Sequence, residues 1–271
     1  MTDATDPAAL PHRRVHDHLV ETRQGAVATL RVDREAALGA LSTGMVTALG
    51  DYFRSIRGSD VRALVITGTG RGFIAGADVA EYRDASKADF DAYQRLSRSV
   101  FTELEHLPQP TVAAVNGYAF GGGFELALCC DLIVASTKAR FGLPEVKLGL
   151  VPGGGGTQRL ARAIGTRATK DLIFRGRSMR PEEAERRGLL VQVVEPGDLQ
   201  SCAGELAAEL AANAPLAVRE AKRLIDEGVQ QALDAALTAE QAALSRLFGS
   251  TDGREGIAAF MDKRDPRFTG S

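Results

Sequence analysis

The chain has 271 residues, of which 44% are hydrophobic and 25% are charged, and its formal net charge is −2. This length suits one large α/β domain, alone or with a helical appendage. The balanced charge argues against general binding to nucleic acid or to a membrane, and no stretch approaches the ~20 apolar residues of a membrane span. The three cysteines, Cys129, Cys130 and Cys202, imply no disulfide framework, so we expect a soluble cytoplasmic protein.

The N-terminal residues are polar and contain prolines, which predicts a disordered leader over residues 1–17. His12, His16 and His18 lie close together in the sequence, in this leader and at the start of the first strand. Clustered histidines can bind a metal, but solvated side chains are the simpler explanation, and no metal site is expected.

The following segment predicts strands and helices in alternation. Residues 18–33 have the pattern of two short strands joined by a turn, and Ser42 is a suitable N-cap for a helix that ends near Arg57. Residues 61–67 form an apolar run typical of a strand buried on both faces. Residues 87–107 then predict an amphipathic helix.

A glycine-rich loop, Gly68 to Asp78, follows the strand at 61–67. It does not match the dinucleotide fingerprint G-x-G-x-x-G, because Phe73 stands where the last glycine is required. Its small residues, 74–77, can instead present a backbone N–H group to a ligand oxygen.

The stretch from Thr111 to Glu145 predicts the functional centre. It contains a strand at 111–115, a glycine triplet at 121–123, a helix from Phe124 and a second strand at 131–136. Glu125 belongs to the first turn of that helix, and Glu145 follows a Gly-Leu-Pro sequence that ends regular structure.

These residue types suit acid–base chemistry on a carbonyl compound. The free N–H groups at a helix start can stabilise a developing oxyanion, and two nearby carboxylates can act as base and acid if their pKa values differ. A purely structural explanation is also open, because glutamate is favoured in a first helical turn and glycines often form a simple turn.

The C-terminal part is predicted to be mainly helical. Gly153 to Gly156 lack the Gly-Lys-Ser/Thr of a phosphate-binding loop, so they are expected to allow close packing before a helix at 157–165. A short helix starts at Pro181. Four helices are then expected over residues 198–212, 215–227, 231–248 and 252–262. The third carries an apolar stripe, interrupted by Glu240, that suits a neighbouring helix: Leu233, Leu237, Leu244 and Leu247.

Four motifs together resemble the crotonase, or enoyl-CoA hydratase/isomerase, superfamily. They are AGAD at 75–78, VNGYAFGGGFELALCCD at 115–131, FGLPEVKLGLVPGGGGTQRL at 141–160 and REGIAAFMDKR at 254–264. The resemblance extends over residues 18–269. It implies an α/β fold, a spiral of repeated ββα units at 18–197, followed by a C-terminal helical region at 198–271 that assembles homotrimers, usually paired into homohexamers.

The resemblance also implies roles for particular residues. Ala77 and Gly122 correspond to the oxyanion-hole donors, and Glu125 and Glu145 to the catalytic carboxylates of a hydratase. The implied substrate and coenzyme A contacts are Ala37, Ala75, Ala77, Asp78, Val79, Ala80, Gly122, Phe260 and Lys263, the last two from a neighbouring subunit. The implied partner is an acyl-CoA thioester, which is the substrate, so no separate cofactor is expected.

One motif departs from the family pattern. Relatives have a sequence close to R-P-x-x-x-N-A-L, whereas residues 34–41 read REAALGAL, with Gly39 in place of asparagine. The coenzyme A contacts near this loop are therefore not fixed by the resemblance. Nor is the acyl-chain preference, because the segment expected to shape that pocket, residues 79–95, cannot be folded from its pattern.

The leading hypothesis is reversible hydration of a trans-2-enoyl-CoA to a 3-hydroxyacyl-CoA. Double-bond isomerisation by one glutamate is the alternative, and a non-catalytic CoA-ester-binding subunit is a third. A serine-triad hydrolase is disfavoured because no histidine lies in a motif near the glycine loops.

Overall fold

A computed structural model describes residues 12–271, so the part of the predicted leader at 1–11 lies outside the described residues. The prediction is wrong for the end of that leader, because His12–His16 forms strand β1. This strand pairs antiparallel with β2 (Leu19–Gln24). Its charged residues resemble a solvated segment in the sequence, but Arg13 forms an ion pair with the buried carboxylate of Glu21, at 2.6 Å.

The larger sheet has seven strands in the order β1-β2-β3-β4-β6-β8-β11. Beyond the two strands already given, its members are β3 (Val27–Val32), β4 (Ala63–Gly68), β6 (Thr111–Val115), β8 (Leu132–Ser136) and β11 (Gln192–Val194). The pairs from β3 to β11 are parallel. The predicted strands at 18–33, 61–67, 111–115 and 131–136 are confirmed.

A second sheet contains strands too short to be recognised in the sequence. Its order is β10-β9-β7-β5, with bounds Ser178–Met179, Arg140–Gly142, Tyr118–Phe120 and Gly72–Ile74. Strand β5 follows β4 in the chain, β7 follows β6, and β9 follows β8. Each turn of the chain thus adds one strand to each sheet before a helix, which is the repeated ββα arrangement that was predicted.

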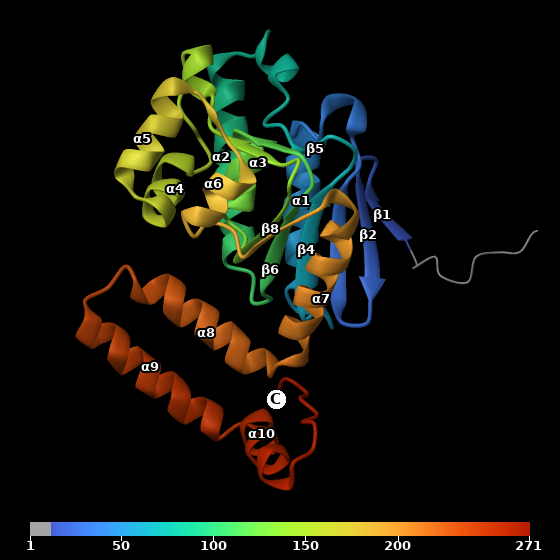
Figure 1. Cartoon of the computed structure of the whole chain (residues 1–271), viewed down its shortest axis with the longest axis vertical. Coiled ribbons are helices and arrows are strands. Elements are labelled where there is room, and N and C mark those ends of the chain that lie inside the picture. Colours follow the sequence, from blue (N-terminus) through green and yellow to red (C-terminus); the bar gives the residue numbers. More distant parts are fainter. Residues whose placement is uncertain (1–11) are drawn as a thin grey trace, which may run out of the picture.

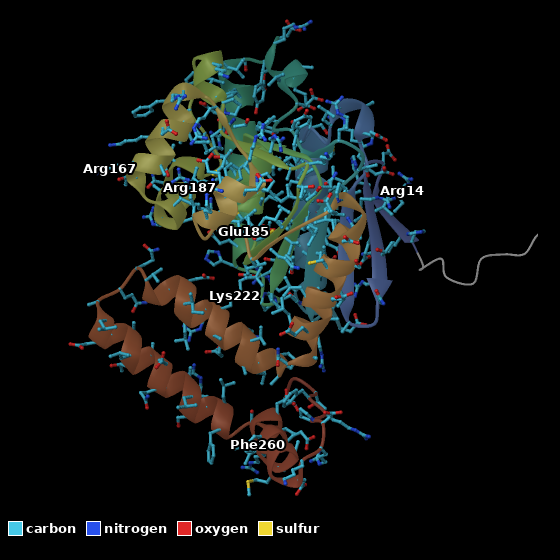
Figure 2. All side chains as sticks on the ribbon, viewed as in Figure 1. Arg14, Arg167, Glu185, Arg187, Lys222 and Phe260 are labelled. Carbon is cyan, nitrogen blue, oxygen red and sulfur yellow. The ribbon has the colours of Figure 1, made fainter. Side chains whose placement is uncertain are left out.

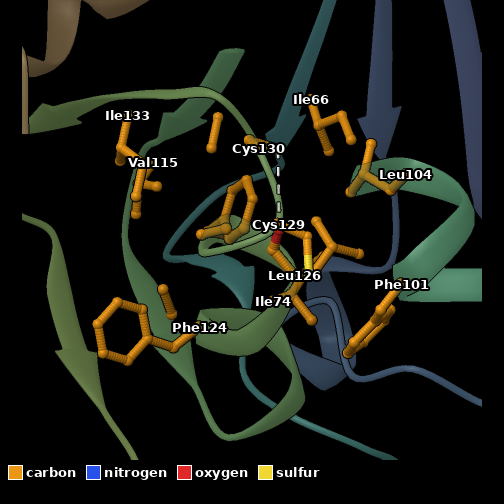
Figure 3. Packing of buried hydrophobic residues seen from close by; sticks show 14 of the residues in the cluster. Ile66, Ile74, Phe101, Leu104, Val115, Phe124, Leu126, Cys129, Cys130 and Ile133 are labelled. Atoms are coloured by element: carbon orange, nitrogen blue, oxygen red, sulfur yellow. Dashed lines mark hydrogen bonds between the residues drawn. The ribbon is translucent and has the colours of Figure 1, made fainter. Parts of the chain in front are cut away.

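Helices cover the larger sheet on both faces. Helix α1 (Thr43–Ile56) begins at Ser42, whose side chain accepts a hydrogen bond from the Met45 amide, and α1 packs against α2 (Lys87–Glu105). The opposite face packs against α7 (Leu199–Ala212), through its alanines. The short helix α3 (Gly122–Ala127) lies inside the molecule, where Phe124 and Leu126 belong to the same buried cluster as Ile74 and Phe101 (Figure 3).

The remaining helices are α4 (Gly156–Ile164), α5 (Thr166–Arg175), α6 (Pro181–Arg186), α8 (Pro215–Gly228), α9 (Leu233–Phe248) and α10 (Thr251–Asp262). Single 3-10 turns are η1 (Glu35–Ala37), η2 (Val79–Tyr82), η3 (Glu145–Leu148) and η4 (Pro196–Asp198). Among residues 12–271, no helix is both long and apolar enough to cross a membrane.

Helices α8, α9 and α10 extend away from the sheets (Figure 1). The sequence places the start of the C-terminal helical region at residue 198, which includes α7. Because α7 covers the sheet, the helices that project from the core begin only with α8, at Pro215.

Candidate active site

A cavity of about 340 Å³ lies between α2, the loop before η2, the start of α3 and the chain from Pro144 to Gly154. It brings together six of the predicted site residues: Ala75, Ala77, Val79, Gly122, Glu125 and Glu145. The two carboxylates and the two proposed amide donors are thus neighbours in the fold, although the sequence separates Ala77 from Glu145 by four strands and two α-helices.

The amides of Ala77 and Gly122 lie on two adjacent chain segments. A Cβ atom added to Gly122 would lie 3.9 Å from the Ala77 nitrogen. Ala77 forms a parallel bridge with Leu41, whose two hydrogen bonds use the Gly76 carbonyl and the Asp78 amide. The N–H of Ala77 itself is therefore directed away from that bridge, and the N–H of Gly122 begins a helix, where it has no intrahelical acceptor.

Gly123 explains why a glycine follows Gly122. A Cβ atom at this position would lie 1.8 Å from the carbonyl oxygen of Ile74, the last residue of β5. The missing side chain lets α3 approach the segment that leads to Ala77, and so holds the two amide donors side by side.

Glu125 extends from α3 into the cavity and is 3% exposed. Its Oε1 accepts a hydrogen bond of 2.7 Å from the Gly156 amide. Burial raises the pKa of Glu125, while hydrogen bonds from the amides of Gly156 and Gly154 and the positive charge of Arg159 oppose that rise. These donors stabilise the ionised form, as a general base requires.

The loop at 153–156 therefore binds the Glu125 carboxylate, a contact that its sequence does not reveal. A Cβ atom on Gly154 would lie 2.8 Å from Oε2 of Glu125, and one on Gly156 would lie 3.0 Å from Oε1. Close packing was predicted here and is confirmed, and the group against which the loop packs is the carboxylate of Glu125. The absence of side chains allows the backbone to approach it.

Glu145 is the first residue of η3 and follows Pro144. Its Oε2 is buried and has no hydrogen-bond partner within residues 12–271. Burial, together with the negative charge of Glu125, raises the pKa of Glu145 to about 7, against a smaller effect of its own backbone amide. Glu145 thus retains a proton near neutrality more readily than Glu125, which is bound by amides.

The sequence reasoning missed two residues that support this site. The Arg159 side chain donates a hydrogen bond of 2.7 Å to the carbonyl of Gly154 and forms an ion pair with Glu105 at 2.6 Å. Arg159 lies in the sequence TQRL, at the end of the family motif at 141–160. Its position in that motif is the feature of the sequence that could have indicated it. Glu105 ends α2 and has no local signal of its own.

Five predicted contact residues do not line the cavity of the single chain: Ala37, Asp78, Ala80, Phe260 and Lys263. The carboxylate of Asp78 is bound by Arg34, at 2.7 Å. Phe260 is 83% exposed on α10, at the far end of the molecule from α2 and α3 (Figures 1 and 2).

The departure at Gly39 has a local explanation. Its φ is +77°, in the left-handed region, and an added Cβ would lie 2.7 Å from the Phe73 carbonyl oxygen. Asparagine tolerates this φ better than most residues, but in this chain the approach of β5 leaves no room for a side chain.

The chain matches the enoyl-CoA hydratase/isomerase family over residues 22–271, and it belongs to this family. It is 40% identical to a short-chain-enoyl-CoA hydratase of Clostridium acetobutylicum, over 92% of this chain and 96% of that protein. It is 36% identical to a crotonyl-CoA hydratase of Syntrophomonas wolfei, over 93% and 98%.

The crystal structure of an enoyl-CoA hydratase from Bacillus anthracis superposes with a TM-score of 0.92 at 36% identity, covering 94% of this chain and all of that one. The predicted family and fold are confirmed. The relatives favour an enoyl-CoA hydratase over the isomerase alternative.

Proposed function

We propose that the protein adds water reversibly, in a syn manner, to a trans-2-enoyl-CoA and forms a 3-hydroxyacyl-CoA. The observation that carries this proposal is the difference between a buried carboxylate, Glu125, and a partly buried one, Glu145, in one cavity. Glu125 is bound by backbone amides, whereas Glu145 has an unpartnered oxygen and a pKa near 7. If the two carboxylates hold one proton between them, Glu125 is the ionised base and Glu145 is the protonated acid. Hydration requires one of each.

In this mechanism the amides of Ala77 and Gly122 bind the thioester oxygen. Glu125 takes a proton from water as the hydroxyl oxygen bonds to the β-carbon, and the electrons of the double bond move onto the thioester as an enolate. Glu145 then gives its proton to the α-carbon, so the product gains one water. Each amide donor to the enolate oxygen contributes about 3 kcal/mol to transition-state stabilisation.

The coenzyme A moiety is carried by the substrate, so the reaction as written needs no further cofactor. We assign its contacts to Ala37, Ala75, Asp78, Val79 and Ala80 of one subunit, and to Phe260 and Lys263 of a neighbour. The remote position of α10 within one chain supports the second assignment. It requires a homotrimer or a homohexamer.

Large exposed apolar side chains on the three projecting helices, and that of Val229 directly after α8, support such an assembly. They are Ile225, Val229, Leu233, Leu237, Leu244, Phe248, Ile257, Phe260 and Met261. A cytoplasmic location belongs to the same proposal and is supported by three free cysteines, two of them buried.

Hydration of crotonyl-CoA tests the reaction. The absorbance of the conjugated enoyl thioester is followed for wild type, Glu125→Gln and Glu145→Gln, and the product mass is measured. We expect a gain of one water by the wild type and a loss of at least ~100-fold in rate for each variant. A Glu145→Gln enzyme with near-normal hydration would refute the mechanism. Movement of the double bond without a gain of water would favour the isomerase alternative.

A further inference from the structure

The wall of the cavity beyond the catalytic pair is one face of α2. Five of its residues line the cavity: Phe90, Tyr93, Gln94, Ser97 and Phe101. All are apolar or neutral, and Ser97 differs from the others in one respect. It is 5% exposed, and its hydroxyl oxygen is buried without a hydrogen-bond partner.

A buried serine within a helix usually donates to the backbone carbonyl four residues earlier. Ser97 makes no such bond within residues 12–271, although an unpartnered buried hydroxyl is unfavourable. The hydroxyl is thus available to a group that enters the cavity.

The neighbouring polar groups of this wall are already engaged. The Tyr93 hydroxyl donates to the Leu41 carbonyl at 3.2 Å, and the Gln94 side-chain amide donates to the Tyr82 hydroxyl at 3.4 Å. Ser97 is near enough to the Tyr93 hydroxyl to oppose the rise that burial causes in the pKa of Tyr93, but the pair does not have hydrogen-bond geometry. Among residues 12–271, the Ser97 hydroxyl is the one buried polar side-chain atom on α2 without a hydrogen-bond partner.

The helix also gives the position of Ser97 relative to the chemistry. Phe101 lies against the catalytic loops: its ring carbons are 4.0 Å from a Cβ placed on Gly122 and 2.7 Å from one placed on Gly154. Ser97 is one turn earlier on the same face, about 6 Å along the axis. A chain that starts between the carboxylates and follows α2 therefore reaches Ser97 a few carbons beyond the β-carbon.

Charge limits the kind of group that fits. Among the described residues that line the cavity there is no lysine, arginine or histidine, and the only carboxylates are Glu125 and Glu145. A carboxylate at the level of Ser97 would have no countercharge and would lose its hydration. A neutral oxygen would lose less hydration free energy than a carboxylate, and it would gain a hydrogen bond from the Ser97 hydroxyl.

Building on the hydratase function, we propose that Ser97 binds a neutral oxygen substituent on the acyl chain, a carbonyl or a hydroxyl about three carbons beyond the β-carbon. The preferred substrates are then oxygenated trans-2-enoyl-CoA thioesters rather than plain hydrocarbon chains. Selectivity arises because a plain chain leaves the buried hydroxyl unpartnered.

The test compares kcat/KM for 6-oxo-trans-2-heptenoyl-CoA and trans-2-heptenoyl-CoA, which have the same carbon chain. We expect the wild type to prefer the oxo substrate by about 5- to 10-fold, the value of one neutral hydrogen bond. Ser97→Ala should reduce this ratio to about one. Ser99→Ala, which alters an exposed serine of the same helix, should keep the wild-type ratio. A chain of equal length that ends in a carboxylate should be the poorest of the three.

Each result has a distinct meaning. A wild-type ratio near one, or a ratio that Ser97→Ala does not change, overturns the Ser97 proposal while leaving the hydratase function in place. A preference for the carboxylate chain also overturns it. Failure to hydrate either heptenoyl substrate or crotonyl-CoA overturns the hydratase function and the Ser97 proposal together.

Discussion

Arg159 and Glu105 form a two-point ion pair, in which Nε donates to Oε1 at 2.7 Å and Nη2 donates to Oε2 at 2.6 Å. This pair joins α4 to the end of α2. The remaining nitrogen, Nη1, donates to the carbonyl of Gly154 at 2.7 Å. Arg159 thus fixes the loop whose amides bind Glu125, and its charge acts on the same carboxylate.

Replacement of Arg159 by methionine should therefore alter the proposed catalytic base, Glu125, without removing any group that lines the cavity. Loss of the positive charge raises the pKa of Glu125, so the acidic limb of the kcat/KM profile for crotonyl-CoA should move to higher pH. We expect kcat to fall by about 10- to 100-fold, within the range that general-base catalysis supplies. Measurement of kcat and KM between pH 5 and 9 checks both effects.

Two further variants control for general disruption. Arg162→Met removes an exposed arginine one turn along α4, which among residues 12–271 bonds only to Gln158, and it should leave the profile unchanged. Arg159→Lys keeps the positive charge but cannot form both hydrogen bonds to Glu105. The acidic limb should therefore stay close to its wild-type position, while kcat should lie between the values of the wild type and Arg159→Met. An unshifted limb in Arg159→Met would show that Arg159 supports only the fold.

The wild-type profile itself follows from the raised pKa of Glu145, about 7. The active pair has one proton: Glu145 protonated for hydration, Glu125 protonated for dehydration. Above the pKa of the pair this proton is lost, so kcat/KM should fall about tenfold per pH unit above pH 7.

The reverse reaction should show the same alkaline limb. Hydration consumes no net proton, so its equilibrium constant is independent of pH, and kcat/KM for dehydration of 3-hydroxybutyryl-CoA must fall with pH in the same way. Limbs that differ between the two directions would contradict a shared-proton pair.

Gly122 and Gly123 should respond differently to the same added methyl group. In Gly122→Ala the new Cβ has nothing nearer than the Ala77 nitrogen at 3.9 Å, so the protein should fold. The methyl group would occupy the cavity beside the oxyanion donors, and kcat/KM should drop by at least ~100-fold.

In Gly123→Ala the Cβ would overlap the Ile74 carbonyl at 1.8 Å. We expect a loss of about 1–3 kcal/mol in the free energy of unfolding, seen as a lower Tm. Equal loss of stability in both variants would mean that the cavity beside Gly122 is not open.

The sequence predicts the main elements well, and the predicted residues Glu125 and Glu145 do lie in one cavity, for physical reasons that differ from residue to residue. The strand at 111–115 is apolar throughout and Ser42 caps a helix, and both signals are local. The second sheet could not be predicted, because β5, β7 and β9 have only three residues each and become strands by pairing with one another.

The parts of the site that the sequence does not reveal depend on contacts between distant residues. Glu105 and Arg159 are 54 positions apart, and the carboxylate that the glycine loop binds lies 31 positions before Gly156. Ser97 belongs to no sequence motif. It is singled out only because it lines the cavity and its buried hydroxyl has no hydrogen-bond partner within residues 12–271. The motifs supply the proposed reacting groups, Glu125 and Glu145, whereas the proposals on substrate preference and on the pKa of Glu125 depend on contacts that only the fold shows.

The apolar face of α9 provides a test of assembly. Leu237 and Leu244 are 47% and 60% exposed, whereas Ala243 is buried within the chain. If the proposed trimer covers the leucines, Leu237→Glu/Leu244→Glu should dissociate it, because two carboxylates would then be buried without partners. Sedimentation equilibrium measures the mass directly.

The matched control is Ala242→Glu, which adds a charge on the opposite side of α9, where residue 242 is exposed. It should keep the wild-type mass. If Phe260 and Lys263 reach coenzyme A from a neighbouring subunit, the dissociated double variant should also have a raised KM for crotonyl-CoA, with Glu125 and Glu145 unaltered. A monomer with wild-type KM would show that one chain forms the whole substrate site, and the assignment of α10 to a neighbour would be wrong.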